Sequence, residues 1–598
     1  MAEKASVKAA AGARAGGKSG FSGSGKGGPL QIGFARSVPG DNRPLDLTTL
    51  SWIAQGDGGS AARIAVTSPG AAAIRVAVVM NETDPDVSVR FAGSGGTGEV
   101  FGPYPANQIA GNNPFWSPVL EGETATLEIY LPPGVTPSKV QLALPQVSHL
   151  VAAAQDLLKA QPVDDIGKSG SCEKDVACIA PTTALTNQAR AVAKMIFTLK
   201  GNTYTCTGTL INDSIVSNTA YFYTANHCIA SQATANTLVT YWFFKAVTCG
   251  SLAVPPYQTV VGGARLLGRS TDYDWVLLRL NGSLPTNPPP VFSAWRADTI
   301  ANSTLISVLH HANGDLLKFS QGTMPGYVTF DDGSSFASAR YTLGSTEPGS
   351  SGSALLTLGA GGTFYELRGG LFGSPTNNEA SCANPNGVDW YSRIDNALPL
   401  VSQYLTPGAA NPAKKTLVVE YYYPTLDDYF ITADPREIAA LDAEVGGWVR
   451  TGLTFLAYSD PVAAPADASP VCRYYVLPQY GDSHVYSADP AECALIGVRF
   501  GNAWVFESAA LFYIQLPNKA TGACPVNTRP VYRFLNKANQ VHHRYLAEVD
   551  DRNCLYYGPD ADVDLPSEPD VCTVTPGTWI LEGYGTPPNQ VVMCSPVS

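Results

Sequence analysis

Apolar and polar residues alternate over short runs in the first part of the chain, and Gly, Pro and Asn separate the runs. The clearest runs are residues 62–66, 74–79 and 124–130. Alternation with a period of two is typical of strands with one buried face, and close spacing by turn residues is typical of a sandwich. We therefore expect a β-sandwich with its linker over residues 32–166, including a short helix at 151–160. Residues 1–31, rich in Ala, Gly, Ser and Lys, are expected to be flexible.

Residues 167–406 contain many further short strand-like runs, and they close with a segment of different periodicity. There Ile394, Leu398, Val401 and Leu405 recur at the spacing of one helix face. This order predicts a β-barrel domain that ends in an amphipathic helix. Residues 407–416, rich in Pro, Ala, Gly, Asn and Lys, predict a linker.

The last part of the chain, residues 417–598, is internally repetitive. Three aromatic segments begin the units, at residues 421–424, 473–476 and 532–535. A second similar segment follows each of them, at 429–435, 484–490 and 543–548, and a tryptophan segment closes each unit, at 448–452, 504–508 and 579–583. Three similar β-rich units predict a pseudo-threefold module, in an arrangement like that of a β-trefoil. The whole chain is therefore expected to be mainly β.

Length and charge limit the classes of partner. With 598 residues the chain is too long for a single hydrophobic core, because a domain usually has roughly 150 residues. A net charge of −12 argues against a groove for nucleic acid or an anionic membrane surface, because both need clustered Lys and Arg. No run reaches the roughly 18 apolar residues of a membrane span. We expect protein or peptide partners and a monomer.

The twelve cysteines fall into two equal groups, six before residue 400 and six after residue 470. Even numbers in each half favour disulfide sets and an oxidising, extracellular destination. No pair has the C-x-x-C spacing and the histidines do not cluster with cysteines, so we expect no metal and no cofactor. The first 28 residues show no apolar signal-peptide core.

Three residues in order suggest hydrolytic chemistry. His227 precedes Cys228, which could bridge to Cys206 and fix the histidine as a general base. Asp274 enters an apolar run, and Ser351 lies in a Gly/Ser-rich turn where the N–H groups of Gly349 and Ser351 could stabilise an oxyanion. Singly, a core histidine and a turn serine need no function. Together they have the order of the chymotrypsin-like double barrel, His, Asp, Ser.

At this point the sequence resembles a known family. Residues 170–172, 224–228, 274–278, 310–311 and 346–353 resemble, in order and spacing, the bacterial lysyl endopeptidases, which are secreted serine proteases with the chymotrypsin fold. The resemblance implies a trypsin-like protease domain that cuts peptide bonds on the carboxyl side of lysine through an acyl-enzyme. Our competing hypothesis is a surface adhesin or lectin-like protein with a vestigial protease domain.

The resemblance also implies how substrate is bound. Asp389, in the segment Asp389-Trp390-Tyr391-Ser392-Arg393 after Cys382, matches the carboxylate that binds the substrate lysine, although it could instead cap the following helix. The edge strand that pairs with substrate is expected at Gly370, Leu371, Phe372 and Gly373. The family commonly has histidine where this chain has Phe372, and proline where it has Ala312. Preference for Lys over Arg stays open.

Activation should differ from that of trypsin. Ser350 stands where chymotrypsin-type zymogens have the aspartate that pairs with a new amino terminus, and serine cannot form that ion pair. Instead the resemblance implies that residues 32–166 are a propeptide, removed by cleavage near 166–168 with Lys168 as a self-processing site. A permanent accessory domain is the alternative.

The resemblance implies three disulfides in the protease domain, Cys172 with Cys382, Cys178 with Cys249 and Cys206 with Cys228. In the C-terminal repeats, nearness alone suggests Cys472 with Cys493, Cys524 with Cys554 and Cys572 with Cys594. These repeats resemble a module of uncharacterised function found on secreted bacterial hydrolases. Their aromatic residues could bind a glycan or cell-surface ligand, or could form the core.

Overall fold

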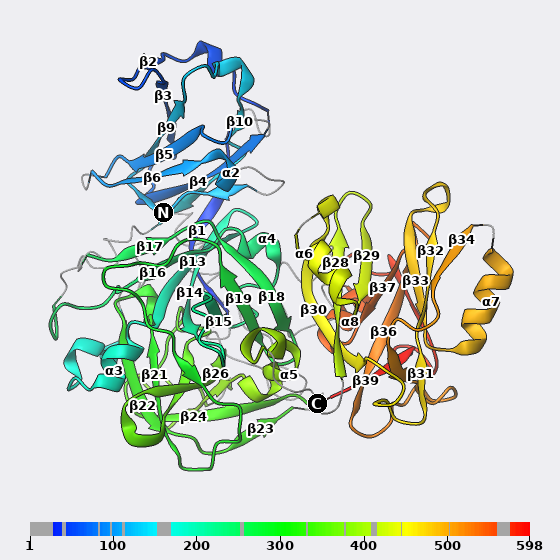
Figure 1. The fold of residues 1–598 in the computed structure, drawn as a ribbon. Coiled ribbons are helices and arrows are strands. Elements are labelled where there is room, and N and C mark those ends of the chain that lie inside the picture. The colour runs from blue at the N-terminus through cyan, green and yellow to red at the C-terminus, as the bar shows by residue number, and fades with distance from the viewer. Residues whose placement is uncertain are drawn as a thin grey trace.

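A computed structural model describes most of the chain. The described residues are 28–38, 43–81, 84–95, 98–109, 114–151, 169–251, 256–330, 333–375, 378–407, 415–443, 445–501, 503–558 and 574–597. Residues 1–27 of the segment expected to be flexible (1–31) and residues 152–160 of the expected helix (151–160) lie outside them. Figure 1 shows three β-rich parts: a blue N-terminal part, a green central part and a yellow-to-red C-terminal part. No helix among the described residues is long and apolar enough to cross a membrane.

The N-terminal part is a β-sandwich, as the alternating runs predict. One sheet has the order β2 (Ile53–Ala54), β3 (Ser60–Thr67), β9 (Thr124–Leu131), β5 (Ser88–Gly93) and β6 (Val100–Pro105). The other contains β4 (Ala73–Asn81), β7 (Phe115–Trp116), β8 (Leu120–Glu121), β10 (Gln141–Ala143) and β11 (Gln146–Leu150), and α2 (Ala106–Ile109) precedes β7. Every second residue of β9 is buried. Apolar side chains from both sheets form one core, because each strand turns one face inward.

One strand joins the sandwich to the central part. β1 (Leu30–Ser37) pairs with β11 on one side and with β14 (Asn202–Ile211) on the other. The order β10-β4-β11-β1-β14-β13-β16-β17 is therefore one continuous sheet. The expected flexible segment needs correction at its end, because Leu30 and Gln31 already pair with Thr205 and Tyr204. Backbone pairing with β14 fixes these residues.

A buried arginine reinforces the same junction. Arg75 of β4 is fully buried, and its guanidinium donates to Thr198 Oγ1 at 2.9 Å and to the Thr237 carbonyl at 2.8 Å. Burial lowers its pKa to about 10. Both acceptors belong to the central part, so the two parts share polar contacts as well as a sheet.

The central part is a double β-barrel. The first barrel comprises β13 (Val192–Leu199), β14, β15 (Tyr221–Thr224), β16 (Val239–Trp242), β17 (Gln258–Val260), β18 (Ala264–Ser270) and β19 (Trp275–Leu280). The second comprises β12 (Lys174–Asp175), β20 (Ala294–Trp295), β21 (Leu305–His310), β22 (Lys318–Thr323), β23 (Tyr327–Thr329), β24 (Ser335–Leu343), β25 (Ala354–Leu358), β26 (Tyr365–Gly373) and β27 (Asp389–Tyr391). The α-helices of the central part are α3 (Thr183–Gln188), α4 (Gln232–Ala235) and α5 (Ile394–Leu405).

The helix α5 closes the double barrel as its periodicity predicts. Ile394, Val401 and Leu405 are buried and Leu398 packs beside them. They share a core with Trp275 of the first barrel and with residues of the second, so α5 covers the seam between the barrels.

The C-terminal part consists of three similar units, which confirms the predicted repeats. The units are β28 (Lys415–Tyr423), β29 (Asp428–Thr432), α6 (Pro435–Asp442) and β30 (Val449–Tyr458); β32 (Cys472–Val476), β33 (Ser483–Ser487), α7 (Pro490–Phe500) and β34 (Trp504–Ser508); and β36 (Thr528–Asn536), β37 (His543–Leu546), α8 (Val549–Tyr557) and β38 (Trp579–Glu582). β31 (Ala468–Pro470), β35 (Tyr513–Gln515) and β39 (Met593–Pro596) connect them. Each unit also contains a helix, which the prediction of a β-rich module did not include.

Equivalent residues of the three units meet at the centre of this module. The Tyr486 hydroxyl accepts from Ile431 N at 3.2 Å, and the Tyr545 hydroxyl accepts from Tyr486 N at 3.0 Å. All three side chains are buried in one core. The aromatic residues at these positions are therefore structural. Short 3-10 helices elsewhere are η1 (Leu47–Thr49), η2 (Pro137–Lys139), η4 (Val176–Cys178), η5 (Ala312–Gly314), η6 (Ala360–Gly362), η7 (Val445–Gly447) and η8 (Pro478–Tyr480).

The disulfides agree with the expectations in the protease domain and differ in the repeats. Cys172 with Cys382, Cys178 with Cys249, Cys206 with Cys228 and Cys472 with Cys493 are bonded as expected. The structure joins Cys524 to Cys594, so the expected pairs Cys524 with Cys554 and Cys572 with Cys594 are wrong. Cys554 is also in a disulfide, whose partner lies outside the described residues.

Sheet pairing explains the corrected disulfide. β39, which contains Cys594, pairs with β36 and β35, and Pro530 of β36 lies opposite Cys594. Cys524 is six residues before Pro530 in the chain, whereas Cys554 is held in α8. The prediction from nearness in sequence was therefore wrong, because the sheet brings together two cysteines that are 70 residues apart in the chain.

Replacing Cys524 and Cys594 together with Ser should lower the free energy of unfolding by about 2–4 kcal/mol, because the cross-link restrains a long loop in the unfolded chain. Chemical denaturation of the variant and the parent measures this difference. A peptide map of the non-reduced parent should contain one mass that joins the Cys524 and Cys594 peptides. A mass joining Cys524 to Cys554 would contradict the pairing.

Candidate active site

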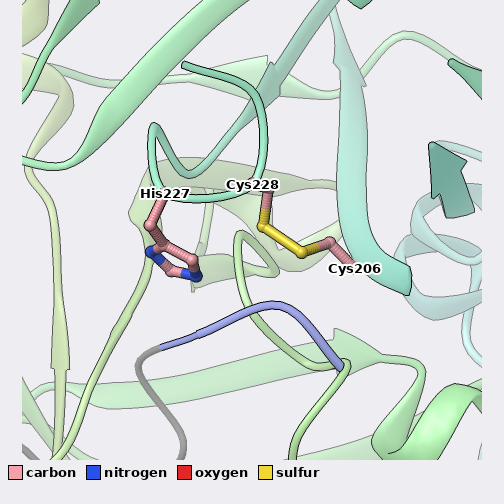
Figure 2. A group of neighbouring side chains, drawn as sticks. All are labelled: Cys206, His227 and Cys228. Atoms are coloured by element: carbon pink, nitrogen blue, oxygen red, sulfur yellow. A yellow bond between two sulfur atoms is a disulfide. The ribbon is translucent and has the colours of Figure 1, made fainter. Parts of the chain in front are cut away.

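His227 follows β15 in a turn that a disulfide anchors. Cys206 of β14 is bonded to Cys228, and Figure 2 shows the imidazole beside this bridge. Because the two sulfur atoms are bonded to each other, neither is a thiolate available to a metal. The histidine is 5% exposed. The bridge ties its turn to the neighbouring strand, as the sequence predicts.

Asp274 holds His227 at two points. Asp274 Oδ1 accepts from the His227 backbone N–H at 2.8 Å, and Asp274 Oδ2 lies 2.9 Å from His227 Nδ1. Both side chains are buried. Two contacts to one carboxylate fix the ring and leave its Nε2 side for a second partner. Among the described residues, His227 Nε2 has no hydrogen-bond partner.

Ser351 lies in a tight turn against the strand that leads to His227. Gly349 and Gly352, on either side of it, have φ of 92° and 79°, in the left-handed region that favours glycine. A Cβ on Gly352 would lie 2.0 Å from Thr224 Oγ1 and 2.8 Å from Ala225 N. Glycine is therefore required for this turn to approach residues 224–225.

Further hydrogen bonds fix the turn from below. Thr207 N donates to the Ser351 carbonyl at 2.9 Å, and Thr207 Oγ1 donates to the Gly349 carbonyl at 3.0 Å. Ser350 Oγ lies 2.8 Å from His310 Nδ1. The side chain of Ser350 therefore contacts the His310 ring. Chymotrypsin-type zymogens have an aspartate at the position of Ser350. His310 belongs to one of the family motifs, but no sequence pattern indicated its contact with Ser350 or the role of Thr207 in this turn.

The N-terminal segment reaches the same turn. The Gly28 carbonyl lies 3.5 Å from Ser351 Oγ, immediately before β1 begins at Leu30. Figure 2 also draws part of the N-terminal segment, coloured blue, below His227. Ser351 is fully buried in this arrangement. Nothing in the sequence signals this contact, because it requires the strand pairing of β1.

Asp389 is fully buried in β27, opposite Ala339 of β24. Its carboxylate accepts from Thr346 Oγ1 at 2.5 Å and from Ser374 Oγ at 2.7 Å. It does not cap α5, whose N-cap residue is Arg393. The capping alternative is therefore excluded.

Two tyrosines lie close to the Asp389 carboxylate. Burial, and then the negative charge of Asp389, hold the pKa of Tyr341 and Tyr391 well above the ordinary value for tyrosine. Their hydroxyls lie 2.5 Å apart. Neutral hydroxyl groups can hold a buried carboxylate in place while its charge remains uncancelled.

The strand expected at Gly370–Gly373 is the end of β26, which is not an edge strand because it pairs with β25 on one side and with β27 on the other. Leu371 N donates to the Ser353 carbonyl and the Leu371 carbonyl accepts from Gly352 N, each at 2.9 Å. Gly370 exchanges backbone and side-chain bonds with Ser392. The ring of Phe372 stacks on Phe336, with centroids 4.7 Å apart. Gly370 and Leu371 thus link the Ser351 turn to β27, which carries Asp389.

Comparison with known proteins identifies the family of this chain. A family model described as "Lysyl endopeptidase, C-terminal domain" matches residues 166–392, and one described as "Lysyl endopeptidase N-terminal domain" matches residues 8–151. A lysyl endopeptidase of Pseudomonas aeruginosa is 38% identical over 391 residues, which are 63% of this chain and 82% of that protein. The chain belongs to the lysyl endopeptidase family. It is a serine endopeptidase, and the adhesin hypothesis with a vestigial protease is not supported.

Solved structures resemble the chain in part. The active form of the Rv3671c protease from M. tuberculosis is 15% identical with a TM-score of 0.26, covering 38% of this chain and 85% of that one. The serine endoprotease from Yersinia pestis is 16% identical with a TM-score of 0.26, covering 41% and 72%. The family membership rests on the sequence matches. Both family models end before the C-terminal repeats.

Replacing Gly352 with Ala should lower peptidase activity by roughly 100-fold or more if the turn of Ser351 belongs to the active site, because a shift of a catalytic group by about 1 Å has that effect. Gly361→Ala is the matched control, since Gly361 has the same φ of 79° and open space around its Cβ position. The control should lose only about 1–2 kcal/mol of stability from the left-handed backbone. Equal activity losses in the two variants would contradict the steric argument. Steady-state assays and thermal unfolding give both quantities.

Proposed function

We propose that the chain is a secreted endopeptidase that cuts after lysine with His227, Asp274 and Ser351 as its triad. The observation that carries the proposal is the double contact of Asp274 with His227, next to the glycine turn that presents Ser351. That arrangement orients a general base by one carboxylate and places a strained serine turn against the same strand.

The proposed reaction has two halves. Ser351 Oγ attacks the scissile carbonyl carbon while His227 Nε2 takes the serine proton, and the N–H groups of Gly349 and Ser351 stabilise the oxyanion. His227 then gives the proton to the leaving amine as the C–N bond breaks, which leaves an acyl-enzyme. Water repeats the sequence and releases the peptide acid and free Ser351.

We assign lysine recognition to Asp389. A buried ammonium group needs an opposite charge, because an unpaired one would suffer a large loss of solvation. Asp389 is fully buried, and β26 connects its strand to the Ser351 turn. Residues Phe372 and Gly373, at the end of β26, are the proposed partners of the substrate backbone.

We propose that the described form is a zymogen. Ser351 and Asp389 are fully buried and the Gly28 carbonyl lies beside Ser351 Oγ, so a peptide cannot reach the nucleophile while β1 is in place. We propose that residues 32–166 are a propeptide and that cleavage near Lys168 precedes its release. Export fits the five described disulfides, which persist in oxidising compartments. Glycan binding by the repeats and the monomeric state stay predictions.

Replacing Ser351 with Ala should abolish hydrolysis of a lysyl peptide p-nitroanilide, with a loss of roughly 10⁴-fold or more, because no other group can form the acyl-enzyme. The same variant should remain a single full-length chain, since it cannot cut near Lys168. Gel electrophoresis and the absorbance of released p-nitroaniline test both points. Hydrolysis at the parent rate would refute the triad.

Replacing Asp389 with Asn should lower kcat/KM for lysyl peptides by roughly 100- to 1,000-fold, which corresponds to about 3–4 kcal/mol for a lost charge-assisted contact. Peptides with a neutral side chain at that position should change little. Mass spectrometry of fragments from a denatured protein gives the residue before every cut and separates Lys from Arg. An unchanged ratio of lysyl to neutral cleavage would overturn the assignment.

A further inference from the structure

Two of the three C-terminal repeats share one scheme at the start of their helix. Asp434 caps α6 by accepting from Arg436 N, and Asp489 caps α7 by accepting from Ala491 N. Three residues after each cap, a glutamate forms a bidentate ion pair with the arginine of the next repeat. These pairs are Glu437 with Arg473, at 2.8 and 2.9 Å, and Glu492 with Arg533, at 2.9 and 3.2 Å.

The third repeat departs from this scheme twice. Glu548, at the N-cap of α8, makes no capping bond with its own helix. Asp551 stands three residues later, where the other repeats have glutamate. An equivalent ion pair from the third repeat back to the first would require an arginine in the first repeat, at the position of Arg473 and Arg533. That position is Glu420, which pairs instead with Arg544 at 3.0 Å.

The protease domain supplies both missing groups from the last two residues of β18 and the turn that leads to β19, residues 269–274, which we call the 269–274 turn. Asp272 accepts from the first two backbone N–H groups of α8, Val549 N at 3.2 Å and Asp550 N at 3.4 Å. Thr271 Oγ1 donates to Asp551 at 2.8 Å, and Arg269 Nη2 forms an ion pair with Asp551 at 3.4 Å. Asp272 thus replaces the missing cap and Arg269 replaces the missing arginine.

Glu548 binds the same turn. Its carboxylate accepts from Ser270 Oγ at 2.9 Å and from Asp272 N at 3.3 Å, and it also pairs with Arg529 at 3.0 Å. Glu548 and Asp551 are 1% and 3% exposed. The interface is therefore a buried, charged contact and is more specific than apolar packing of two surfaces.

This turn ends at Asp274, the residue that holds His227. Asp274 has a φ of 48°, and its N–H donates to the Thr271 carbonyl at 3.3 Å, so its placement depends on the turn. Arg269 also donates to Asn226, the residue before His227, at 3.2 Å, and to the Thr451 carbonyl of the module at 3.2 Å. One arginine therefore touches the module, the turn and the histidine segment.

We propose that the C-terminal module is a positioning element of the protease, in which the third repeat holds the 269–274 turn and, through it, Asp274 and His227. Asp551 and Glu548 are positioning residues, and neither touches the reacting atoms. The proposal rests on the proposed triad. It gives the repeats an intramolecular partner, the protease domain of the same chain, and explains why the third repeat differs from the other two.

The test uses the full chain and compares Asp551→Ala with the matched control Glu492→Ala. Both remove a carboxylate from the same position of a repeat, although Asp551 is buried and the Glu492 side chain is 36% exposed. Glu492 pairs with Arg533 inside the module. Active sites are counted by the burst of an ester substrate, so that kcat refers to correctly folded molecules. Asp551→Ala should lower kcat for a lysyl p-nitroanilide by 10- to 100-fold with KM within twofold, because misplaced catalytic groups affect the chemical step. Asp551→Asn should retain more activity than Asp551→Ala.

The control variant should keep kcat within twofold of the parent. Arg269→Ala combined with Asp551→Ala should cost less than the sum of the two single changes, since both break the contact between Arg269 and Asp551. A kcat within twofold for Asp551→Ala, or an equal fall for Glu492→Ala, would overturn the positioning role while Ser351→Ala is still inactive. If Ser351→Ala retained activity, the triad would fail and the positioning role with it.

Discussion

A single carboxylate determines the geometry of the site, because Asp274 binds both the backbone N–H and the ring of His227. A buried carboxylate is stable only where donors converge on it, and here the histidine supplies two of them. The contact requires the end of β15 and the start of β19 to lie side by side, which their pairing from Tyr221 to Thr224 ensures. The disulfide of Cys228 then restrains the other side of the same turn. The strands and the disulfide of the first barrel therefore hold Asp274 and His227 in contact.

Strand pairing joins the N-terminal sandwich to the protease domain. β1 fills an edge of β14 that would otherwise expose unpaired backbone groups, and it continues from the segment beside Ser351. The pairing of β1 thus completes a sheet and brings the Gly28 carbonyl beside Ser351. Buried Arg75 adds polar contacts across the junction, so separation of the two parts would leave a charged group without its acceptors.

Much of this could be predicted from the sequence, because local patterns report local structure. Alternating runs gave the sandwich, the spacing of Ile394, Val401 and Leu405 gave α5, and the motif around Ser351 gave a glycine turn whose φ values require glycine. Contacts between distant segments were not predictable in this way. The Gly28 contact depends on β1 joining the sheet, and Cys524 meets Cys594 only because β39 lies beside β36. Sequence separation carries no information on either.

The third repeat, which differs from the other two, contains a sequence signal of a contact between distant segments. This signal can be interpreted only with the structure. Glu420 stands where two other repeats have arginine, and a repeat alignment alone would treat this as variation. Arg544 pairs with Glu420 and also lies within the electrostatic influence of Asp551, so two carboxylates of the module act on one cation. Two acidic groups sharing one cation favour a second positive partner, and Arg269 of the protease provides it. The loss of one arginine from the repeat pattern thus creates an acidic docking site for the turn that holds Asp274.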